Sequence, residues 1–522
     1  MANKTLFQTQ REGLLPGADR VNEAGGSAYA LSSQQALAQY AVTGCFTRTF
    51  YSDAENQLEQ VLELCEQVDS AFIAKTALYC REHGFMKDMP ALLCAVLAKR
   101  DLALLEQVFD RVIDNGKMLR NFVQIVRSGV TGRKSLGSAP KRLVRHWLES
   151  RSPEQVFRSS LGQSPSFSDI LKMVHPKPES AEREALYGWM IGRPYDADQL
   201  PDQVKSFEAF KQGAISEVPD VPFQMLTALP LDRRAWSTIA RRAPWQMTRM
   251  NLNTFARHDV FDDVALVRQI TDRLRSEAEI RKARVFPYQL LAAYKNAGKR
   301  VPKRIVNALQ DAMEIAIRNV PQLPGKIVVC PDISGSMHSP VTGYRPGAAS
   351  NVRCLDVAAL VAAAFLMQNA ATEVLPFENE VVSVRLNPRD SVMTNAEKLA
   401  SLPYGGTNCS APLRLLAETG MDVDLVVFVS DNESWLDSSR CGRFEGGATE
   451  TMKQWTRIKA RNPESRMVCI DIQPYATSQA VERPDILNIG GFSDRVFELI
   501  ALFARGELDS SHWVGSIEAV DV

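Results

Sequence analysis

The sequence predicts a multidomain α plus α/β fold, in which a long helical array precedes a doubly wound parallel-sheet domain. Two observations carry this prediction. From about residue 30 to residue 320, apolar residues recur every three or four positions, as in Leu58, Val61 and Cys65, and strand-like alternation is almost absent. After that point short apolar runs alternate with helical segments, which is the order that builds a parallel sheet.

The helical array fits a stack of paired helices. Helix starts are marked by capping residues, as at Ser152-Pro153 and Ser168-Asp169. Successive helical hairpins of roughly 35–45 residues predict HEAT-like repeats, each of which stacks on its neighbours. The stretch 321–325, which reads Pro-Gln-Leu-Pro-Gly, ends the array. We therefore expect one domain at 1–320 and a second at 321–522.

The second domain contains candidate strands and helices in alternation. Strands are expected at 326–331, 373–376, 381–386, 424–429 and 467–472. Helices are expected at 355–370, 411–418, 449–460 and 494–504. This order predicts a doubly wound, Rossmann-like parallel sheet with one antiparallel hairpin partner near its edge.

Length and composition limit the class of protein. The chain has 522 residues, of which 45% are hydrophobic and 23% charged, as is typical of a soluble protein of two or three domains. The net charge is zero, but residues 1–300 carry 41 Lys and Arg against 34 Asp and Glu, and the remainder has the opposite excess. This asymmetry predicts separate roles, with any nucleic acid meeting the basic first part.

Cysteine usage and the N-terminus indicate a cytoplasmic protein. The nine cysteines are odd in number and form no CxxC pair, which favours reduced thiols over a disulfide framework or a zinc site. Residues 1–10 are polar and lack the apolar core of a signal peptide. The longest apolar stretch, 357–367, is too short to span a bilayer, so we expect no membrane partner.

The motif with the clearest chemistry is Asp332-Ile333-Ser334-Gly335-Ser336, which follows an apolar run. A carboxylate and two hydroxyls on one turn can present three hard oxygens to Mg²⁺. Thr407 adds a hydroxyl on a Gly-rich loop, and Asp431 ends a second apolar strand. Loops at the carboxyl ends of strands converge in such a sheet, so these segments are expected to meet. The alternative is that they are ordinary turn serines and capping aspartates.

This constellation resembles the metal-ion-dependent adhesion site of von Willebrand factor A domains. The resemblance implies a bound divalent cation, expected to be Mg²⁺. Its ligands, direct or through water, would be Asp332, Ser334, Ser336, Thr407 and Asp431. A remaining ligand position would be left for an acidic group of a partner.

A basic region lies within the helical array. Between residues 117 and 148 there are eight Lys and Arg and no acidic residue. Lys134 belongs to a basic loop, and Lys141, Arg142 and Arg145 can share one face at a helix start. Positive charge is poorly placed there for the helix dipole, and phosphates of a nucleic acid would satisfy it. A solvated basic face without a ligand is the alternative.

A second set of arginines surrounds Trp236 and Trp245. These tryptophans either stack on single-stranded bases or, as we favour, belong to the core. A lone histidine at a helix end, such as His175, usually has a structural or surface role.

A helical array followed by such an A domain resembles the Ro autoantigen family over nearly the whole chain. Supporting segments are 22–26 (Asn-Glu-Ala-Gly-Gly), 169–178 and Phe286-Pro287-Tyr288. The resemblance implies a monomeric, ring-shaped TROVE module closed by contacts with the A domain. Within it Arg158, Lys172 and His175 would contact RNA, whereas a second basic position of the family appears here as Gly162.

The resemblance further implies a non-catalytic RNA-binding component of a ribonucleoprotein. Members of the family bind Y RNA on an outer basic surface, and they bind single-stranded ends of misfolded or structured RNAs through the ring, in RNA quality control. Bacterial relatives cooperate with polynucleotide phosphorylase. The alternative is a protein-binding adaptor whose metal site captures a partner carboxylate. An enzyme is less favoured, because His338 is the one candidate base near two carboxylates.

Overall fold

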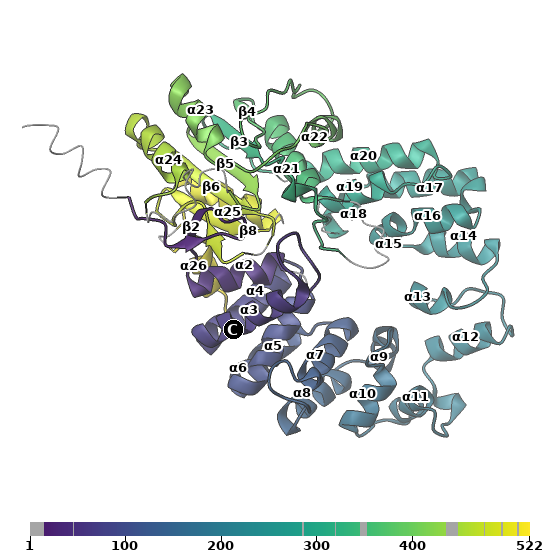
Figure 1. Cartoon of the computed structure of the whole chain (residues 1–522). Helices are drawn as coiled ribbons and strands as arrows, with labels where there is room; N and C mark the ends of the chain where they lie inside the picture. Colours follow the sequence, from purple (N-terminus) through teal and green to yellow (C-terminus); the bar gives the residue numbers. More distant parts are fainter. Residues whose placement is uncertain are drawn as a thin grey trace, which may run out of the picture. The chain divides into compact units, whose positions relative to one another are not determined.

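The computed structural model describes residues 15–522 except 45, 284, 286, 319, 345–351, 435–446, 474, 492–493 and 509–510. The chain divides into two compact units (Figure 1). The first unit joins the residues up to Gln67 with 275–296 and 309–519, and the second joins 68–274 with 297–308 and 520–522. The domain division at 320/321 stays a prediction, but these units differ from it, because the first 67 residues lie with the sheet.

The larger sheet of the first unit has five strands in the order β4-β3-β5-β6-β8, and every pairing is parallel. The strands are β3 (Ile327–Pro331), β4 (Thr372–Val374), β5 (Leu425–Ser430), β6 (Arg466–Asp471) and β8 (Ile486–Gly490). Every residue of β3, β5 and β8 is buried, which explains their continuous apolar runs. The winding direction changes between β3 and β5, because β4 lies on the other side of β3.

Helices cover both faces of this sheet (Figure 1). On one face, Leu413 of α23 and Trp455 of α24 join buried strand residues in a single hydrophobic cluster. On the other face lie α21 and α25, whose Phe365 and Phe497 rings are 5.8 Å apart. The helices of this unit are α2 (Ser33–Thr43), α3 (Ala54–Gln67), α18 (Glu277–Ala283), α19 (Pro287–Lys295), α21 (Cys354–Gln368), α22 (Val392–Ala400), α23 (Ala411–Thr419), α24 (Glu450–Arg461), α25 (Asp494–Arg505) and α26 (His512–Glu518).

The N-terminal segment packs on the sheet domain, although the helical array separates the two in sequence. Its strands β1 (Arg20–Val21) and β2 (Ser27–Ala30) form a small antiparallel sheet with β7 (Thr477–Ser478). Tyr29 lies opposite Ser478, and the Asn22 side chain donates a hydrogen bond of 2.7 Å to the carbonyl of Ser434. No pattern in the sequence indicated this pairing.

The second unit is helical. Its helices are α4 (Ser70–Glu82), α5 (Asp88–Arg100), α6 (Leu102–Val112), α7 (Gly116–Ser128), α8 (Ser138–Glu149), α9 (Pro153–Ser159), α10 (Phe167–Val174), α11 (Ala181–Ile191), α12 (Asp202–Lys211), α13 (Phe223–Leu226), α14 (Arg233–Arg242), α15 (Trp245–Met250), α16 (Leu252–Arg257), nearly all of α17 (Val264–Arg275) and the start of α20 (Lys303–Ile317). Helices close in the chain pack together, such as α4 with α5, α6 with α8 and α9 with α11. This local packing is what repeated helical pairs predict.

The predicted antiparallel hairpin at the sheet edge is wrong. Residues 381–386 are not a strand; Phe377 and Val381 form a single antiparallel bridge, and the N–H of Val382 donates to the carbonyl of Pro376 at 2.8 Å. Proline has no N–H, so the ladder cannot continue at Pro376 and the segment diverges from β4. The fifth strand is instead β8, at the opposite edge.

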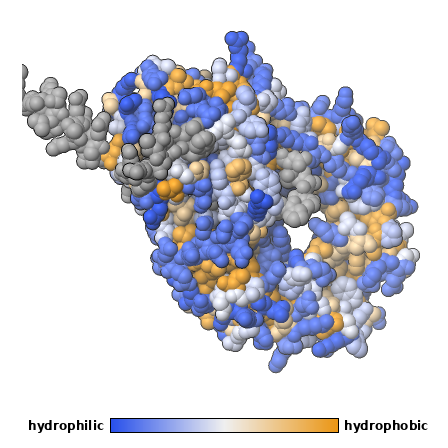
Figure 2. Space-filling view, in the orientation of Figure 1, coloured by the Kyte–Doolittle hydropathy of each residue, from blue (hydrophilic) through white to orange (hydrophobic). Residues whose placement is uncertain are grey.

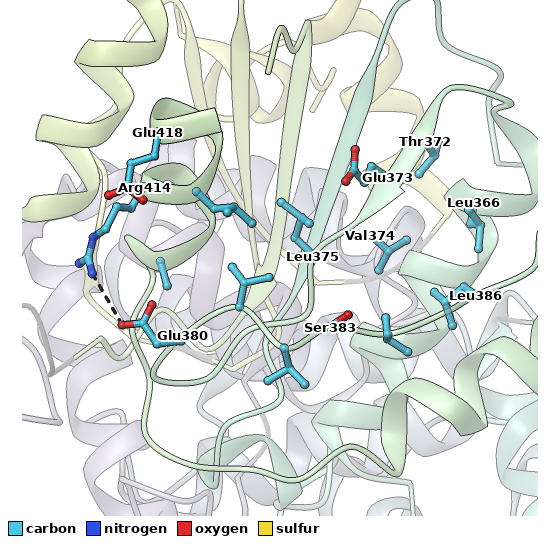
Figure 3. A pocket seen from close by; sticks show the side chains of 15 residues that line it. Leu366, Thr372, Glu373, Val374, Leu375, Glu380, Ser383, Leu386, Arg414 and Glu418 are labelled. Atoms are coloured by element: carbon cyan, nitrogen blue, oxygen red, sulfur yellow. Dashed lines mark ion pairs between the residues drawn. The ribbon is translucent and has the colours of Figure 1, made fainter. Parts of the chain in front are cut away.

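The divergence leaves a pocket of about 540 Å³ beside β4. In Figure 3 the side chains of Val374, Ser383 and Leu386 border this pocket, and the ion pair between Arg414 and Glu380, at 3.7 Å, lies at one end. The other predicted strands and helices of the sheet domain are confirmed within about two residues at each end.

The surface shown in Figure 2 is mostly polar, and the described cysteines lie in the interior. Figure 2 shows small hydrophobic patches scattered over a mostly hydrophilic face. In the part of the chain that the structure describes, no helix has both the length and the apolar character needed to cross a membrane. The seven described cysteines are buried. Cys45, Cys441 and Phe286 lie outside the described residues.

Candidate functional site

The ends of β3 and β5 place two carboxylates side by side. Pro331, the last residue of β3, is in register with Val429 of β5, and the N–H of Asp332 donates to the Val429 carbonyl at 3.0 Å. Asp332 and Asp431 therefore leave adjacent strands at the carboxyl edge of the sheet, where the winding direction changes. This is the position at which doubly wound sheets bind ligands.

The first loop turns its oxygens toward one another. An Asp332 carboxylate oxygen accepts a hydrogen bond of 2.8 Å from the N–H of Ser334, and the Ser334 and Ser336 hydroxyls lie 3.2 Å apart. Ser336 opens a short 3₁₀ turn that ends at His338. All three predicted ligands are buried, so their oxygens are held by the fold rather than by solvent.

The Gly-rich loop joins the same site. The N–H of Gly335 donates to the carbonyl of Gly405 at 3.1 Å, and the hydroxyl of Ser434 donates to the carbonyl of Thr407 at 3.4 Å. The Glu378 carboxylate and the Asn379 amide lie directly against Gly405, in the space that a side chain there would occupy. Thr407 is buried beside these contacts.

Burial and mutual repulsion make these carboxylates unfavourable as bare anions. Burial, and then the negative charge of Asp431, raise the pKa of Asp332 to about 7. Burial also raises the pKa of Asp431, and a hydrogen bond from Ser336 opposes this change. Within the described residues, no Lys, Arg or His forms an ion pair with either group. A buried site with two carboxylates, three hydroxyls and no cationic side chain fits a hard divalent cation.

Three residues of this site were missed from the sequence. The hydroxyl of Ser430 donates to Asp332 at 2.6 Å, and Tyr51 is hydrogen-bonded to Ser336. Glu433 accepts a bond of 3.2 Å from the N–H of Ala24, while its other carboxylate oxygen is buried and unpaired within the described chain. Ser430 could have been found, because it directly precedes Asp431. Tyr51 and Glu433 could not, because their placement depends on the packing of the N-terminal segment.

The predicted RNA-contact residues lie on α7 to α10 and the turns beside them. Lys134, Lys172 and His175 are exposed, and His175 ends α10 in the left-handed conformation (φ 48°). Lys141 and Arg145, both half-buried, lie in the first two turns of α8. Helix α10 packs against both α7 and α8. Contact of these residues with RNA stays a prediction.

Three of the arginines are engaged within the protein. Arg142 forms an ion pair with Glu106, and Arg145 donates to the carbonyl of Val174. Arg158 forms an ion pair of 2.7 Å with Asp220. Because these arginines form ion pairs with acidic side chains or donate to a backbone carbonyl, they are weaker candidates for phosphate contacts than Lys172.

A cavity of about 650 Å³ lies between α7 and α10 and was not predicted. Arg127 at the end of α7 and Lys172 on α10 line it, together with Gln124, Ser128 and Asp169. Hydrogen bonds from Ser166 lower the pKa of Asp169, and the charges of Lys172 and Arg127 act in the same direction. Arg127 had been counted in the basic run, but only the helix packing places it beside Lys172.

The Arg120 guanidinium lies against Gly162. The φ of Gly162 is +103°, and a side chain there would overlap the guanidinium of Arg120, which fills the space. Arg120 in turn donates to the carbonyl of Gln163 at 3.1 Å. A positive charge therefore lies beside the position where the family resemblance places a basic side chain.

The two tryptophans of the second basic set are core residues, as favoured from the sequence. Trp236 and Trp245 are both buried. The Trp245 ring N–H donates to the carbonyl of Leu274 at 3.2 Å, and the Trp236 ring stacks on His258 at 4.2 Å. They are not available to stack on RNA bases.

The chain is similar to proteins of the Ro family in both sequence and fold. Residues 326–504 match the Ro60 vWA domain family. The RNA-binding protein RO60 of Deinococcus radiodurans is 25% identical over 527 aligned positions, which cover 93% of this chain and 95% of that protein. The resemblance to the Ro family is confirmed. The RNA-binding protein RO60 of Caenorhabditis elegans is 22% identical over 257 positions, 47% of this chain and 38% of that protein.

The fold is likewise similar to that of a solved Ro protein. The crystal structure of the Deinococcus radiodurans RO (RSR) protein matches with a TM-score of 0.63 and 21% identity, over 91% of this chain and 100% of that one. The predicted combination of a helical array with a Ro60-type von Willebrand factor A domain is therefore confirmed.

Proposed function

We propose that this chain is a non-catalytic RNA-binding protein of the Ro type. The observation that carries the proposal is the basic cavity between α7 and α10, where Arg127 and Lys172 face an open volume of about 650 Å³. Phosphates favour such a site, because each contact with Lys or Arg releases counterions from the nucleic acid. Both relatives are named as RNA-binding proteins, which supports RNA as the ligand and agrees with the absence of an enzymatic role.

The finer features of the proposal rest on the family resemblance. The RNA would be a Y-like small non-coding RNA, held on the α7–α10 surface, together with the single-stranded ends of misfolded or structured RNAs. The protein would act as a monomer in the cytoplasm, in RNA quality control, processing or degradation. Polynucleotide phosphorylase is the proposed nuclease partner.

The metal centre has a separate role in this proposal. Asp332, Ser334, Ser336, Thr407 and Asp431 would hold Mg²⁺, whose charge relieves the repulsion between the two buried carboxylates. The cation would leave one ligand position for an acidic side chain of a partner. The chain's own residues fix the three loops around that position.

A second candidate function uses this metal centre alone. In it the protein is an adaptor that captures a partner carboxylate, and the basic surface is only solvated. The buried carboxylates and hydroxyls at the sheet edge favour the adaptor role. An adaptor role alone does not explain the basic cavity of the helical unit. The two candidates predict different losses when the cavity is changed.

The test is equilibrium binding of a fluorescently labelled stem-loop RNA to the nuclease-treated protein over a series of salt concentrations. The double variant Arg127→Glu/Lys172→Glu should weaken binding by at least about tenfold, because each lost contact is charge-assisted. Its slope of log affinity against log salt should fall by about two.

The matched control is Lys282→Glu, an exposed lysine on α18 of the other unit. It makes the same charge change as each of the two exchanges in the double variant, and it should alter binding less than about twofold. Equal binding by the double variant and the wild type would refute the proposal. Loss of binding in Asp332→Ala, with the double variant unaffected, would favour the metal centre instead.

A further inference from the structure

A second cavity of the helical unit, about 530 Å³ in volume, has a different chemistry from the basic one. Its walls come from α9 to α13 and the turn after α9, and six of its side chains are aromatic or thioether. Those residues are Phe157, Phe167, Trp189, Met190, Phe207 and Met225. The polar side chains at the same cavity are Ser160, Gln163, Ser166, Ser168, Glu208 and Lys211. This combination is typical of sites for flat organic ligands.

Two of the aromatic rings pack against a third. Phe157 is fully buried. The Trp189 ring lies 5.7 Å from it at 67°, and the Phe207 ring lies 6.1 Å from it at 58°. Trp189 and Phe207 are only half-buried, whereas Trp236 and Trp245 are enclosed by the core. The walls of the cavity are therefore ring surfaces that the protein does not itself cover.

The rim of the cavity carries a guanidinium. Gly162 lines the cavity, and because it has no side chain the Arg120 guanidinium lies directly against it. One terminal nitrogen of Arg120 donates to the Gln163 carbonyl, and its Nε is buried without a hydrogen-bond partner among the described residues. Lys211 also lines the cavity and is paired with Glu208 at 3.3 Å. Arg120 therefore places a positive charge beside the cavity.

We propose that this cavity binds one unpaired nucleobase of single-stranded RNA. The base would stack on the uncovered part of the Trp189 and Phe207 rings, and the adjoining phosphate would lie near Arg120, which is next to the cavity at Gly162. Aromatic side chains and arginine guanidinium groups are the two partners on which unstacked bases pack. An aliphatic ligand would use the apolar walls but would offer no negative group to the guanidinium beside them. The inference rests on the proposed RNA-binding function and assigns it a second subsite.

The test uses the full chain and two RNAs of the same sequence, a single strand of about 12 nucleotides and its duplex. The variant Phe207→Leu keeps apolar volume but removes the ring, and Phe210→Leu is the matched control. Phe210 is three residues along the same helix, is also half-buried, and does not line the cavity. Phe207→Leu should weaken single-strand binding about fivefold or more, with duplex binding changed less than about twofold. Phe210→Leu should change neither.

Equal single-strand binding by Phe207→Leu and wild type, or an equal loss in Phe210→Leu, would overturn the inference. If wild type bound neither RNA, the proposed function itself would fail, so the two failures are distinguishable. A crosslink on the unmodified protein provides a second measurement that does not depend on folding of a variant. Single-stranded RNA with 4-thiouridine should attach to the peptides that contain Trp189 or Phe207, and attachment only elsewhere would contradict the site.

Discussion

Replacing Asp332 by Asn should stabilise the metal-free protein and abolish its response to divalent cations. Both Asp332 oxygens accept hydrogen bonds, from the Ser334 N–H at 2.8 Å and the Ser430 hydroxyl at 2.6 Å. An asparagine of the same shape can keep the first bond, and Ser430 can accept the second. What the substitution removes is the buried negative charge next to Asp431.

The magnitude follows from the pKa of Asp332, which is about 7 in the fold against an ordinary value of 3.8. The raised pKa means that the folded chain keeps a proton that the unfolded chain has lost, so stability falls as pH rises from about 4 to about 7. The difference of about three pH units corresponds to about 4 kcal/mol of lost stability above pH 7. At about pH 5 the loss is only about 2 kcal/mol.

The assay is thermal unfolding in EDTA at about pH 8 and about pH 5, with and without Mg²⁺ or Mn²⁺. For a domain of this size, about 1 kcal/mol shifts the melting temperature by about 2–4 °C. Asp332→Asn should therefore melt several degrees above wild type in EDTA at the higher pH, with a smaller gap at the lower pH. Added cation should raise the melting temperature of wild type only.

Asp422→Asn is the control, because Asp422 is exposed in the same domain and should show no such gap. The reasoning would be refuted if Asp332→Asn melted no higher than wild type in EDTA at the higher pH. It would also be refuted if cations raised the melting temperature of the variant as much as that of wild type.

Two further substitutions test the metal site and the stability of the helical unit. Thr407→Val should lower cation affinity at least about tenfold in a calorimetric titration, because it removes a hydroxyl of the proposed metal site at nearly constant volume. Arg183→Met should destabilise the helical unit by about 2–4 kcal/mol in urea unfolding, because the buried guanidinium donates to the carbonyls of Leu148 and Arg151 at 2.7 Å each. An unchanged unfolding midpoint for Arg183→Met would show that these carbonyls find other donors.

The sheet domain was largely predictable because its strands are buried on both faces. Such strands appear in sequence as continuous apolar runs, as β3 and β5 do, and their ends locate Asp332 and Asp431. The strand expected at 381–386 failed for a local reason: its alternating pattern is real, but Pro376 supplies no N–H to extend the pairing. β8 was missed because its apolar run is as short as many non-strand segments.

The same distinction applies to the residues of the candidate sites. Residues that follow a strand directly could be found from the sequence, because the fold class fixes where strand ends meet. The pairing of β2 with β7, which carries the N-terminal segment onto the sheet domain, depends on contacts between residues more than 400 positions apart. The aromatic cavity likewise depends on how five helices pack, and Phe157, Trp189 and Phe207 have no spacing in sequence that would reveal it.

In the function proposed above, the helical unit binds a specific small RNA. The most direct test of this function is sequencing of the RNA that remains bound to the native protein through purification, alongside the Arg127→Glu/Lys172→Glu variant prepared in the same way. The account predicts that one small stem-loop RNA is strongly enriched with wild type and depleted with the variant. RNA recovered in proportion to its cellular abundance, or equally with both proteins, would contradict it.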